Sequence, residues 1–247
     1  MKIISVVGAR PNFMKIAPFI KVVSAYNDSE ENIDHVLVHT GQHYDDRMSK
    51  SFFTALEIPD ADINLGIGSG SHAEQVGHTM IAFEKVLLEE KPDWVIVLGD
   101  VNATIACSLA AKKLHIRVCH IEAGLRSFDE RMPEEINRLV TDRLSDLLLT
   151  PDELSIENLK KEGIPNSKIE FVGNIMIDTL ESNREKASDL IINEIIKDNF
   201  IQEQKSNDFN IFKSTTTPFA LMTMHRPSNV DQNEVLEPII RFLLDEV

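Results

Sequence analysis

The chain has 247 residues, and its 25 basic and 40 acidic side chains give a formal net charge of −15 at neutral pH. This length fits one large domain or two ordinary ones, and 43% hydrophobic with 26% charged residues excludes a disordered, collagen-like or coiled-coil protein. The negative charge argues against nucleic acid as a partner, and no apolar run approaches the roughly 20 residues that span a bilayer, so we expect a soluble, cytoplasmic protein with no membrane partner.

Strand and helix signals alternate along the first two thirds of the chain. Short apolar, β-branched runs predict strands, and segments with apolar residues three or four apart predict helices between them. The expected strands are 2–7, 35–40, 94–98, 116–121, 146–150 and 169–172. The expected helices follow Pro11, begin at Pro133, or cover 48–56, 72–90, 103–114 and 152–162. This order predicts right-handed βαβ units and a doubly wound parallel sheet, which is an α/β fold.

The pattern changes after Gly173-Asn174. A helix and a polar stretch over about 199–217 are followed by one strand at 219–224, a loop at 225–231 and a helix to Val247. One strand and one helix cannot close a sheet or bury a core of their own. We therefore expect residues 1–173 to form a complete α/β domain, and residues 174–247 to be a linker and the truncated start of a second domain.

Cationic residues follow the first strand. Ligands of open parallel sheets bind beyond the carboxyl ends of the strands. Gly8 permits a tight turn there, and Arg10 and Lys15 add positive charge near the start of the next helix, which suits a diphosphate. Taken alone, these residues are better explained as an ordinary turn with surface cations, because neither G-x-G-x-x-G nor a P-loop is present.

Three carboxylates are expected near these cations. Asp100 and Glu122 each follow a buried strand, and Glu134 opens a helix. Glu134 alone is equally well explained as a residue that complements the helix dipole and pairs with Arg138, four positions later. Convergence of the three carboxylates at one sheet edge favours function, because clustering like charges costs stability.

Other histidines and the cysteines give weaker signals. His225-Arg226 follows the strand at 219–224, and faces the same cleft if the two domains oppose their carboxyl edges. His120 is expected to be internal, and Cys107 and Cys119 to be small buried hydrophobes. The remaining histidines have no ligand spacing and are expected to be structural or solvated: His35, His39, His72, His78 and His115. No H-E-x-x-H, C-x-x-C or G-x-S-x-G occurs, so zinc, redox and serine-hydrolase mechanisms have no support.

Several motifs follow one another over nearly the whole chain. They are Gly8-Ala9-Arg10-Pro11 with Lys15, Gly41-Gln42-His43-Tyr44-Asp45, Gly99-Asp100, His120-Ile121-Glu122-Ala123-Gly124-Leu125-Arg126, Pro133-Glu134-Glu135-Ile136-Asn137-Arg138, Gly173-Asn174 and His225-Arg226. With these motifs the chain resembles the UDP-N-acetylglucosamine 2-epimerases. The resemblance implies two doubly wound Rossmann-like domains in a glycosyltransferase-B-like arrangement, with the active site in the cleft between them and the second domain incomplete in this chain.

The resemblance also implies an activity and its residues. It implies interconversion of UDP-GlcNAc and UDP-ManNAc for cell-surface polysaccharide biosynthesis, by a homodimer that needs no metal, nicotinamide or other cofactor. The residues carried over by matching motif are catalytic Asp100, Glu122, Glu134 and His225, substrate-binding Arg10, Lys15, Arg138 and Arg226, and Gln42 and His43, which match a second, regulatory UDP-GlcNAc site in some bacterial members.

The reaction explains why such residues are needed. Loss of UDP from C1 acidifies the C2–H, a carboxylate removes that proton, and re-addition to 2-acetamidoglucal from the other face inverts C2. Two alternatives stay open: the hydrolysing branch, which releases UDP and ManNAc, and a non-catalytic sugar-nucleotide-binding module. Ser228 stands where members often carry Glu, and the family's later Asp-Ser-Gly-Gly stretch and Glu pair do not follow His225. We therefore expect the 247-residue chain by itself to be inactive.

Overall fold

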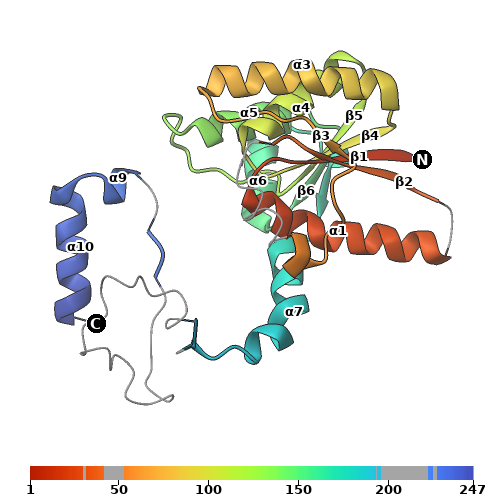
Figure 1. Ribbon diagram of the computed structural model, residues 1–247. Helices are drawn as coiled ribbons and strands as arrows, with labels where there is room; N and C mark the ends of the chain where they lie inside the picture. The colour runs from red at the N-terminus through yellow and green to blue at the C-terminus, as the bar shows by residue number, and fades with distance from the viewer. Residues whose placement is uncertain (30–31, 42–52, 193, 196–221, 225–226, 247) are drawn as a thin grey trace. The chain divides into compact units, whose positions relative to one another are not determined.

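The computed structural model describes residues 1–29, 32–41, 53–192, 194–195, 222–224 and 227–246 (Figure 1). The chain divides into two compact units, Met1–Glu185 and Lys186–Val247. None of the helices in these described ranges is long and apolar enough to cross a membrane.

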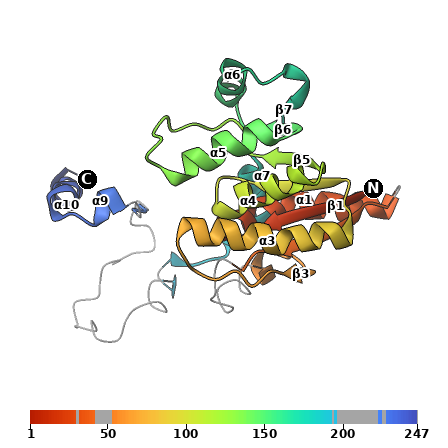
Figure 2. The same ribbon diagram turned by 90° about the horizontal axis from the view of Figure 1, so that it is seen from above.

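The first unit is built on one parallel sheet. Its strands are β1 (Lys2–Val7), β2 (Asp34–His39), β3 (Ile63–Asn64), β4 (Trp94–Leu98), β5 (Arg117–Ile121), β6 (Leu147–Thr150) and β7 (Ile169–Phe171). They lie in the order β3-β2-β1-β4-β5-β6-β7, and every neighbouring pair is parallel. Figure 2 shows β3 at one edge of the sheet and β7 at the other. The α/β fold with a doubly wound parallel sheet is therefore confirmed.

Helices lie on both faces of the sheet; those before β7 connect the strands, and α7 follows β7. They are α1 (Arg10–Ser29), α3 (His72–Glu90), α4 (Asn102–Lys113), α5 (Pro133–Leu144), α6 (Glu153–Lys161), the 3-10 turn η1 (Asn166–Lys168) and α7 (Ile175–Ser188). Figure 1 shows α1 and α3 on opposite sides of the sheet. Helix α3 begins where predicted because Ser71 and Glu74 form a capping box.

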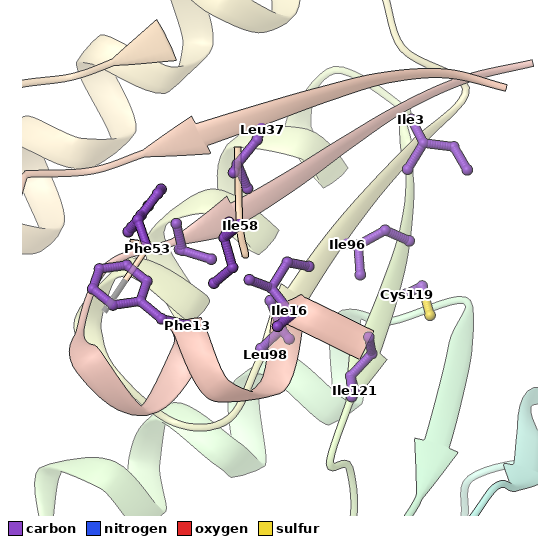
Figure 3. Close-up of a cluster of buried hydrophobic side chains, with 12 residues drawn as sticks. Ile3, Phe13, Ile16, Leu37, Phe53, Ile58, Ile96, Leu98, Cys119 and Ile121 are labelled. Atoms are coloured by element: carbon purple, nitrogen blue, oxygen red, sulfur yellow. The ribbon is translucent and has the colours of Figure 1, made fainter. Parts of the chain in front are cut away.

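Two apolar layers hold these helices on the sheet. Alternate side chains of a strand face opposite sides, so Ile3 of β1 packs on the α1 side, together with Phe13 and Ile16 of α1 (Figure 3). Ile4, the next residue of β1, packs on the other side against Phe83 of α3. Each such buried side chain contributes about 1.5–3 kcal/mol, so the layers fix the strand ends that carry the polar residues described below.

Both cysteines lie in these layers, as expected. Cys107 and Cys119 are free thiols and are 0% and 3% exposed. Burial raises the pKa of the Cys119 thiol to about 12, which makes it unreactive at neutral pH.

The structure differs from the sequence-based elements at a few places. The short strand β3 was not expected, because two residues carry no periodicity that a pattern can detect. Of the helix expected over 48–56, residues 53–56 are helical and 48–52 lie outside the described residues.

The second unit departs further from expectation. Its described helices include α9 (Pro227–Val230), inside the loop expected at 225–231, and α10 (Asn233–Glu246). The structure assigns no strand to residues 222–224, so the strand predicted at 219–224 is wrong there. Residues 219–221 lie outside the described ranges. A strand needs a pairing partner, and the described part of this unit offers none.

Candidate active site

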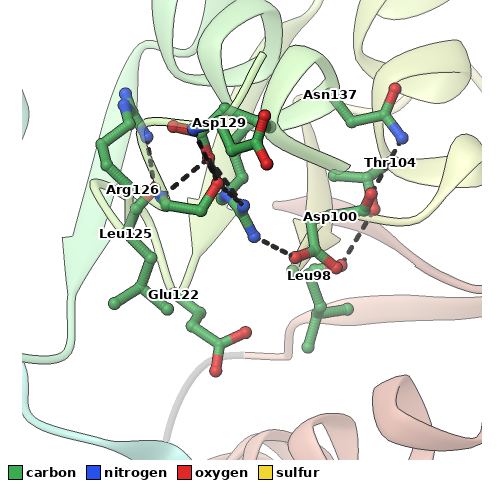
Figure 4. A network of polar contacts seen from close by, with 12 residues as sticks. Leu98, Asp100, Thr104, Glu122, Leu125, Arg126, Asp129 and Asn137 are labelled. Atoms are coloured by element: carbon green, nitrogen blue, oxygen red, sulfur yellow. Dashed lines mark hydrogen bonds and ion pairs between the residues drawn. The ribbon is translucent and has the colours of Figure 1, made fainter. Parts of the chain in front are cut away.

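The carboxyl ends of β4 and β5 carry the two acids that the sequence placed there. The strands are in register, with Leu98 opposite Ile121, and the Gly99 N–H donates to the Ile121 carbonyl at 3.1 Å. Asp100 and Glu122 therefore leave neighbouring strands at one edge of the sheet, as Figure 4 shows.

Lys15 of α1 meets Glu122 at this edge. The Lys15 Nζ donates to Glu122 Oε2, and the two side chains are 11% and 17% exposed. Gly99 lies against the pair with a φ of +62°, and a Cβ at this position would stand 2.9 Å from Lys15 Nζ. The positive φ favours glycine at this position, and a side chain there would displace the end of Lys15.

Asn12 fastens the first loop to the same edge. Its Oδ1 accepts from the Gly8 and Ala9 N–H groups, each at 3.1 Å, and its Nδ2 donates to the Leu98 carbonyl at 3.0 Å. Asn12 is 2% exposed. These bonds satisfy the polar groups of a buried turn and hold the start of α1, with Lys15 one turn later, beside the end of β4.

Arg138 of α5 reaches the other acid. Its Nη1 donates to Asp100 Oδ2 at 2.5 Å, and its Nε and Nη2 donate to Glu135 Oε2 at 2.9 and 2.6 Å. Asn137, the preceding residue, donates from Nδ2 to the Asp100 carbonyl at 2.8 Å. Helix α5 thus holds Asp100 by both its backbone and its side chain.

Glu135 is the most buried carboxylate of this group, at 2% exposed. Burial alone raises the pKa of a carboxyl, but hydrogen bonds from the Ser127 and Phe128 N–H groups, the Ser127 hydroxyl and Arg138 outweigh it and lower the pKa of Glu135 to about 2. Glu135 is therefore ionised throughout the physiological range.

A second polar layer lies beneath the site. His120 Nδ1 is 2.6 Å from Asp142 Oδ1, and His120 Nε2 is 2.8 Å from the Gly99 carbonyl. Asp142 also forms an ion pair with Arg126, whose Nη2 lies 2.8 Å from Asp142 Oδ2. Burial raises the pKa of Asp142, but the charges and hydrogen bonds of His120 and Arg126 reverse the effect and lower it below its usual value. His120 is internal, as predicted, and links this layer to the turn before Asp100.

Comparisons with known proteins agree on one family. A family model described as UDP-N-acetylglucosamine 2-epimerase matches residues 26–246. A UDP-N-acetylglucosamine 2-epimerase homolog from Methanococcus maripaludis is 46% identical, over 99% of this chain and 63% of its own length. The chain belongs to the UDP-N-acetylglucosamine 2-epimerase family.

Two further relatives are similar over nearly the whole chain. The UDP-2,3-diacetamido-2,3-dideoxy-D-glucuronate 2-epimerase of Pseudomonas aeruginosa is 41% identical, over 98% of this chain and 62% of its own. A second relative is seen in the crystal structure of Methanocaldococcus jannaschii UDP-GlcNAc 2-epimerase in complex with UDP-GlcNAc and UDP. Its sequence is 40% identical to this chain, and the two structures superpose with a TM-score of 0.82 over 99% of this chain and 62% of that one. The chain spans less than two thirds of the length of each of these relatives.

The structure brings some of the expected site residues together. Lys15 lies on Glu122 and Arg138 lies on Asp100, so two of the three expected acids each meet a cation at one edge. Glu134 has an exposed side chain. The alternative pairing of Glu134 with Arg138 is wrong, because among the described residues the guanidinium forms ion pairs with Asp100 and Glu135.

Five other predicted site positions cannot be placed. Gln42, His43, His225 and Arg226 lie outside the described residues, and Arg10 begins α1 with a side chain that also lies outside them. The part of the chain that the structure describes contains no group of three or more His, Cys, Asp or Glu side chains arranged to hold a metal ion.

Sequence reasoning missed three residues that shape the site: Asn12, Glu135 and Asn137. Glu135 and Asn137 stand inside a quoted motif, and Asn12 directly follows another, yet none was singled out. The available signal was the polarity of α5, whose buried residues are Glu135, Asn137, Thr141 and Asp142. Buried polar side chains need partners, so a helix that buries four of them marks a polar network rather than an apolar core.

Proposed function

We propose that the full-length protein is a non-hydrolysing UDP-N-acetylglucosamine 2-epimerase that interconverts UDP-GlcNAc and UDP-ManNAc. The observation that carries the proposal is the pairing of Asp100 and Glu122 with cations at one sheet edge, in a chain 40% identical to an epimerase whose crystal structure contains UDP-GlcNAc and UDP. We assign the proton transfers at C2 to Asp100, Glu122 and Glu134.

The reaction requires that the C1–O bond to UDP breaks before the C2 proton leaves. The C2–H is not adjacent to a carbonyl, so the oxocarbenium character that develops at C1 is what makes it acidic. The bonding electrons leave with UDP, a carboxylate takes the C2 proton, and 2-acetamidoglucal remains. A carboxylic acid then returns a proton to the opposite face of C2, and UDP adds again at C1.

Charge at the sheet edge serves both halves of this reaction. Lys15 and Arg138 offer positive charge to the departing diphosphate, as do Arg10, Arg226 and His225 in our proposal. Cations that already stand in place stabilise the developing negative charge without rearranging. Two acid–base groups are needed because the proton leaves from one face of C2 and returns to the other.

The proposal extends to the organisation of the protein. We assign residues 1–173 to the domain that carries the acids and 174–247 to a linker and the start of a UDP-binding domain. We propose a homodimer located in the cytoplasm, with Gln42 and His43 in a regulatory UDP-GlcNAc site. We expect the 247 residues by themselves, which match 63% of the length of one relative, to be inactive, since binding of the remote nucleotide positions the sugar for reaction.

An isotope experiment on the full-length protein tests the reaction. In deuterated water, UDP-GlcNAc is expected to gain deuterium at C2, and an oxygen label that bridges C1 and the diphosphate is expected to move to non-bridging positions. Free ManNAc and UDP as main products would instead establish the hydrolysing reaction. Binding of UDP-GlcNAc without either exchange or hydrolysis would establish a non-catalytic module.

A second substrate is supported by one relative. The Pseudomonas aeruginosa protein that is 41% identical acts, by its name, on UDP-2,3-diacetamido-2,3-dideoxy-D-glucuronate. The same C2 chemistry applies to both sugars. Parallel assays with the two nucleotide sugars separate the candidates, because the preferred substrate is the one with the higher kcat/KM.

A further inference from the structure

Glu135 carries a buried charge that the proposed reaction does not use. Its carboxylate accepts from the Ser127 N–H, the Ser127 hydroxyl and the Phe128 N–H, each at 3.0 Å, and from Arg138 Nε and Nη2 at 2.9 and 2.6 Å. An acid in the first turn of a helix complements the helix dipole even when it is exposed, as Glu134 is. The burial and the five donors therefore need another explanation.

The five donors come from two places that must be kept together. Two belong to Arg138, three residues along α5, and three belong to the loop after β5. Phe128 in that loop has a φ of +57° and is 75% exposed. A left-handed backbone is costly for a residue with a side chain, so the loop is held in this conformation by its bonds rather than by its own preference.

The contacts with Arg138 determine where its guanidinium points. The group is planar and rigid, so two hydrogen bonds from Nε and Nη2 to one carboxylate oxygen leave it no freedom to rotate. The remaining edge then directs Nη1 at Asp100 Oδ2, at 2.5 Å.

Asp100 depends on this guanidinium for its own orientation. Among the described residues, Arg138 provides the ion pair of the Asp100 side chain, which is 33% exposed. The backbone of Asp100 is held by Asn137, but that bond fixes only the carbonyl, at 2.8 Å. The carboxylate is thus open to a ligand on one side and held by Arg138 on the other.

We propose that Glu135 is a positioning residue for the proposed epimerase reaction, which clamps the Arg138 guanidinium so that it fixes the Asp100 carboxylate. The inference rests on the proposed function, because it assigns Glu135 a purpose in the reaction of Asp100. Glu135 itself does not touch substrate in this account. Its effect reaches the reaction through Arg138.

The test is Glu135→Gln in the full-length protein, with Glu130→Gln as the matched control. Glu130 is an exposed acid in the same loop region. We expect Glu135→Gln to lower kcat by about 10–100-fold with KM within about 3-fold, since small misplacement of a reacting group has effects of this size. Glu130→Gln is expected to match the unaltered protein.

A double variant shows whether the effect passes through Arg138. If Glu135 acts by holding Arg138, then Glu135→Gln adds little to Arg138→Gln, and the combined loss equals that of Arg138→Gln alone within about 2-fold. Multiplicative losses, or an unchanged kcat in Glu135→Gln, overturn the proposal. If Glu135→Gln fails to fold, the same measurements are made on Glu135→Asp. This variant keeps the negative charge, but its side chain is one methylene shorter and the carboxylate lies farther from Arg138.

A crystal structure of the variant separates this proposal from the proposed function. We expect Arg138 to leave Asp100 in Glu135→Gln, and a guanidinium that stays in place overturns the positioning role whatever the enzyme does. If the unaltered protein places no deuterium at C2, the proposed function has failed, and the crystal structure still decides whether Glu135 holds Arg138.

Discussion

Arg126, in the loop after β5, and Arg138, in α5, have similar partners and different surroundings. Arg126 forms ion pairs with Asp142 and Glu162, and Arg138 forms them with Asp100 and Glu135. In each set one carboxylate is buried and the other is 33% exposed. Ion pairing and burial therefore do not by themselves distinguish a functional group of charges from a structural one.

The difference lies in the guanidinium and in what surrounds it. The Arg126 side chain is 1% exposed, and its carboxylate partner Asp142 also binds His120 and the Gly124 N–H. The Arg138 side chain is 12% exposed and its partner Asp100 stands at the carboxyl edge of the sheet, where ligands of such folds bind. The Arg126 guanidinium is therefore covered by the protein, whereas Arg138 and Asp100 remain accessible to a ligand.

Left-handed backbone conformations also occur in the loop after β5. Near Arg126 the positive φ of +83° falls on Gly124, where a Cβ would stand 2.5 Å from the Ser155 carbonyl oxygen. Positive φ angles also fall on two residues with side chains: Glu122, at 72°, which pairs with Lys15, and Phe128, at 57°, which donates to Glu135. Residues with side chains are kept in this conformation only where the surroundings enforce it, and such positions gather at functional sites.

The largest expected effect is the loss of stability in Asp142→Asn. The substitution leaves the buried Arg126 and His120 without their carboxylate, and breaking a buried pair in this way costs about 3–5 kcal/mol. Urea unfolding followed by the fluorescence of Trp94, the one tryptophan of the chain and a residue of β4, measures the free energy of unfolding of the first unit. A loss below about 1 kcal/mol, the size of an ordinary surface effect, would contradict a closed structural role.

The same substitution at Asp100 is expected to act on activity instead. Asp100→Asn keeps the size of the side chain and removes its acid–base function, so kcat is expected to fall by roughly 10²-fold or more, about 2.7 kcal/mol, with little change in stability. Asp146→Asn is the matched control, because Asp146 is 28% exposed and pairs with Lys112 before β6, at the opposite end of the strands. Turnover of Asp100→Asn within a few-fold of the unaltered protein would remove Asp100 from the reaction.

Acid is expected to weaken the first unit through Glu135. Its pKa is 4.5 in the unfolded chain and about 2 in the folded protein, so its stabilising contribution is full above about pH 5 and disappears as the pH falls toward 2. About 2 kcal/mol of this contribution is lost between pH 7 and pH 3. Glu135→Gln is expected to lose correspondingly less stability over that interval than the unaltered protein, whereas Glu130→Gln keeps the original slope. Equal slopes in all three proteins would show that Glu135 is not held as an ionised group.

Much of the first unit follows from local sequence signals. The bounds of α3 were predictable because Ser71 and Glu74 cap its start and Pro92 stands just beyond its end. β4 was predictable because five consecutive apolar residues end at Gly99. Both signals lie within a few residues of the boundary they set, and neither depends on the rest of the chain.

The partners within the site could not be read in the same way. Lys15 and Glu122 are 107 positions apart, and Asp100 and Arg138 are 38 apart. The sequence placed these residues at one edge, but which cation meets which acid depends on the loop after β5. Glu134 and Glu135 are adjacent on the helix, and it is Glu135 that accepts hydrogen bonds from the Ser127 and Phe128 N–H groups, which lie in a different segment.

The smallest expected effect is a gain in stability in Phe128→Gly. Phe128 is 75% exposed, so removing its side chain loses little packing. A left-handed φ costs a residue with a side chain about 1–2 kcal/mol, and glycine gives back about 0.5–1 kcal/mol through the greater freedom of the unfolded chain. The free energy of unfolding, followed by Trp94 fluorescence, is therefore expected to rise by about 0.5–1 kcal/mol.

Phe171→Gly is the matched control for this gain. Phe171 is also exposed, at 56%, but it lies in β7 and has no positive φ. Glycine there brings the entropic cost without relieving strain, so stability is expected to fall by about 0.5–1 kcal/mol. Opposite signs in the two variants would locate strain in the loop that Glu135 holds beside Asp100. A loss of stability in both variants would mean that the left-handed backbone of Phe128 is not strained.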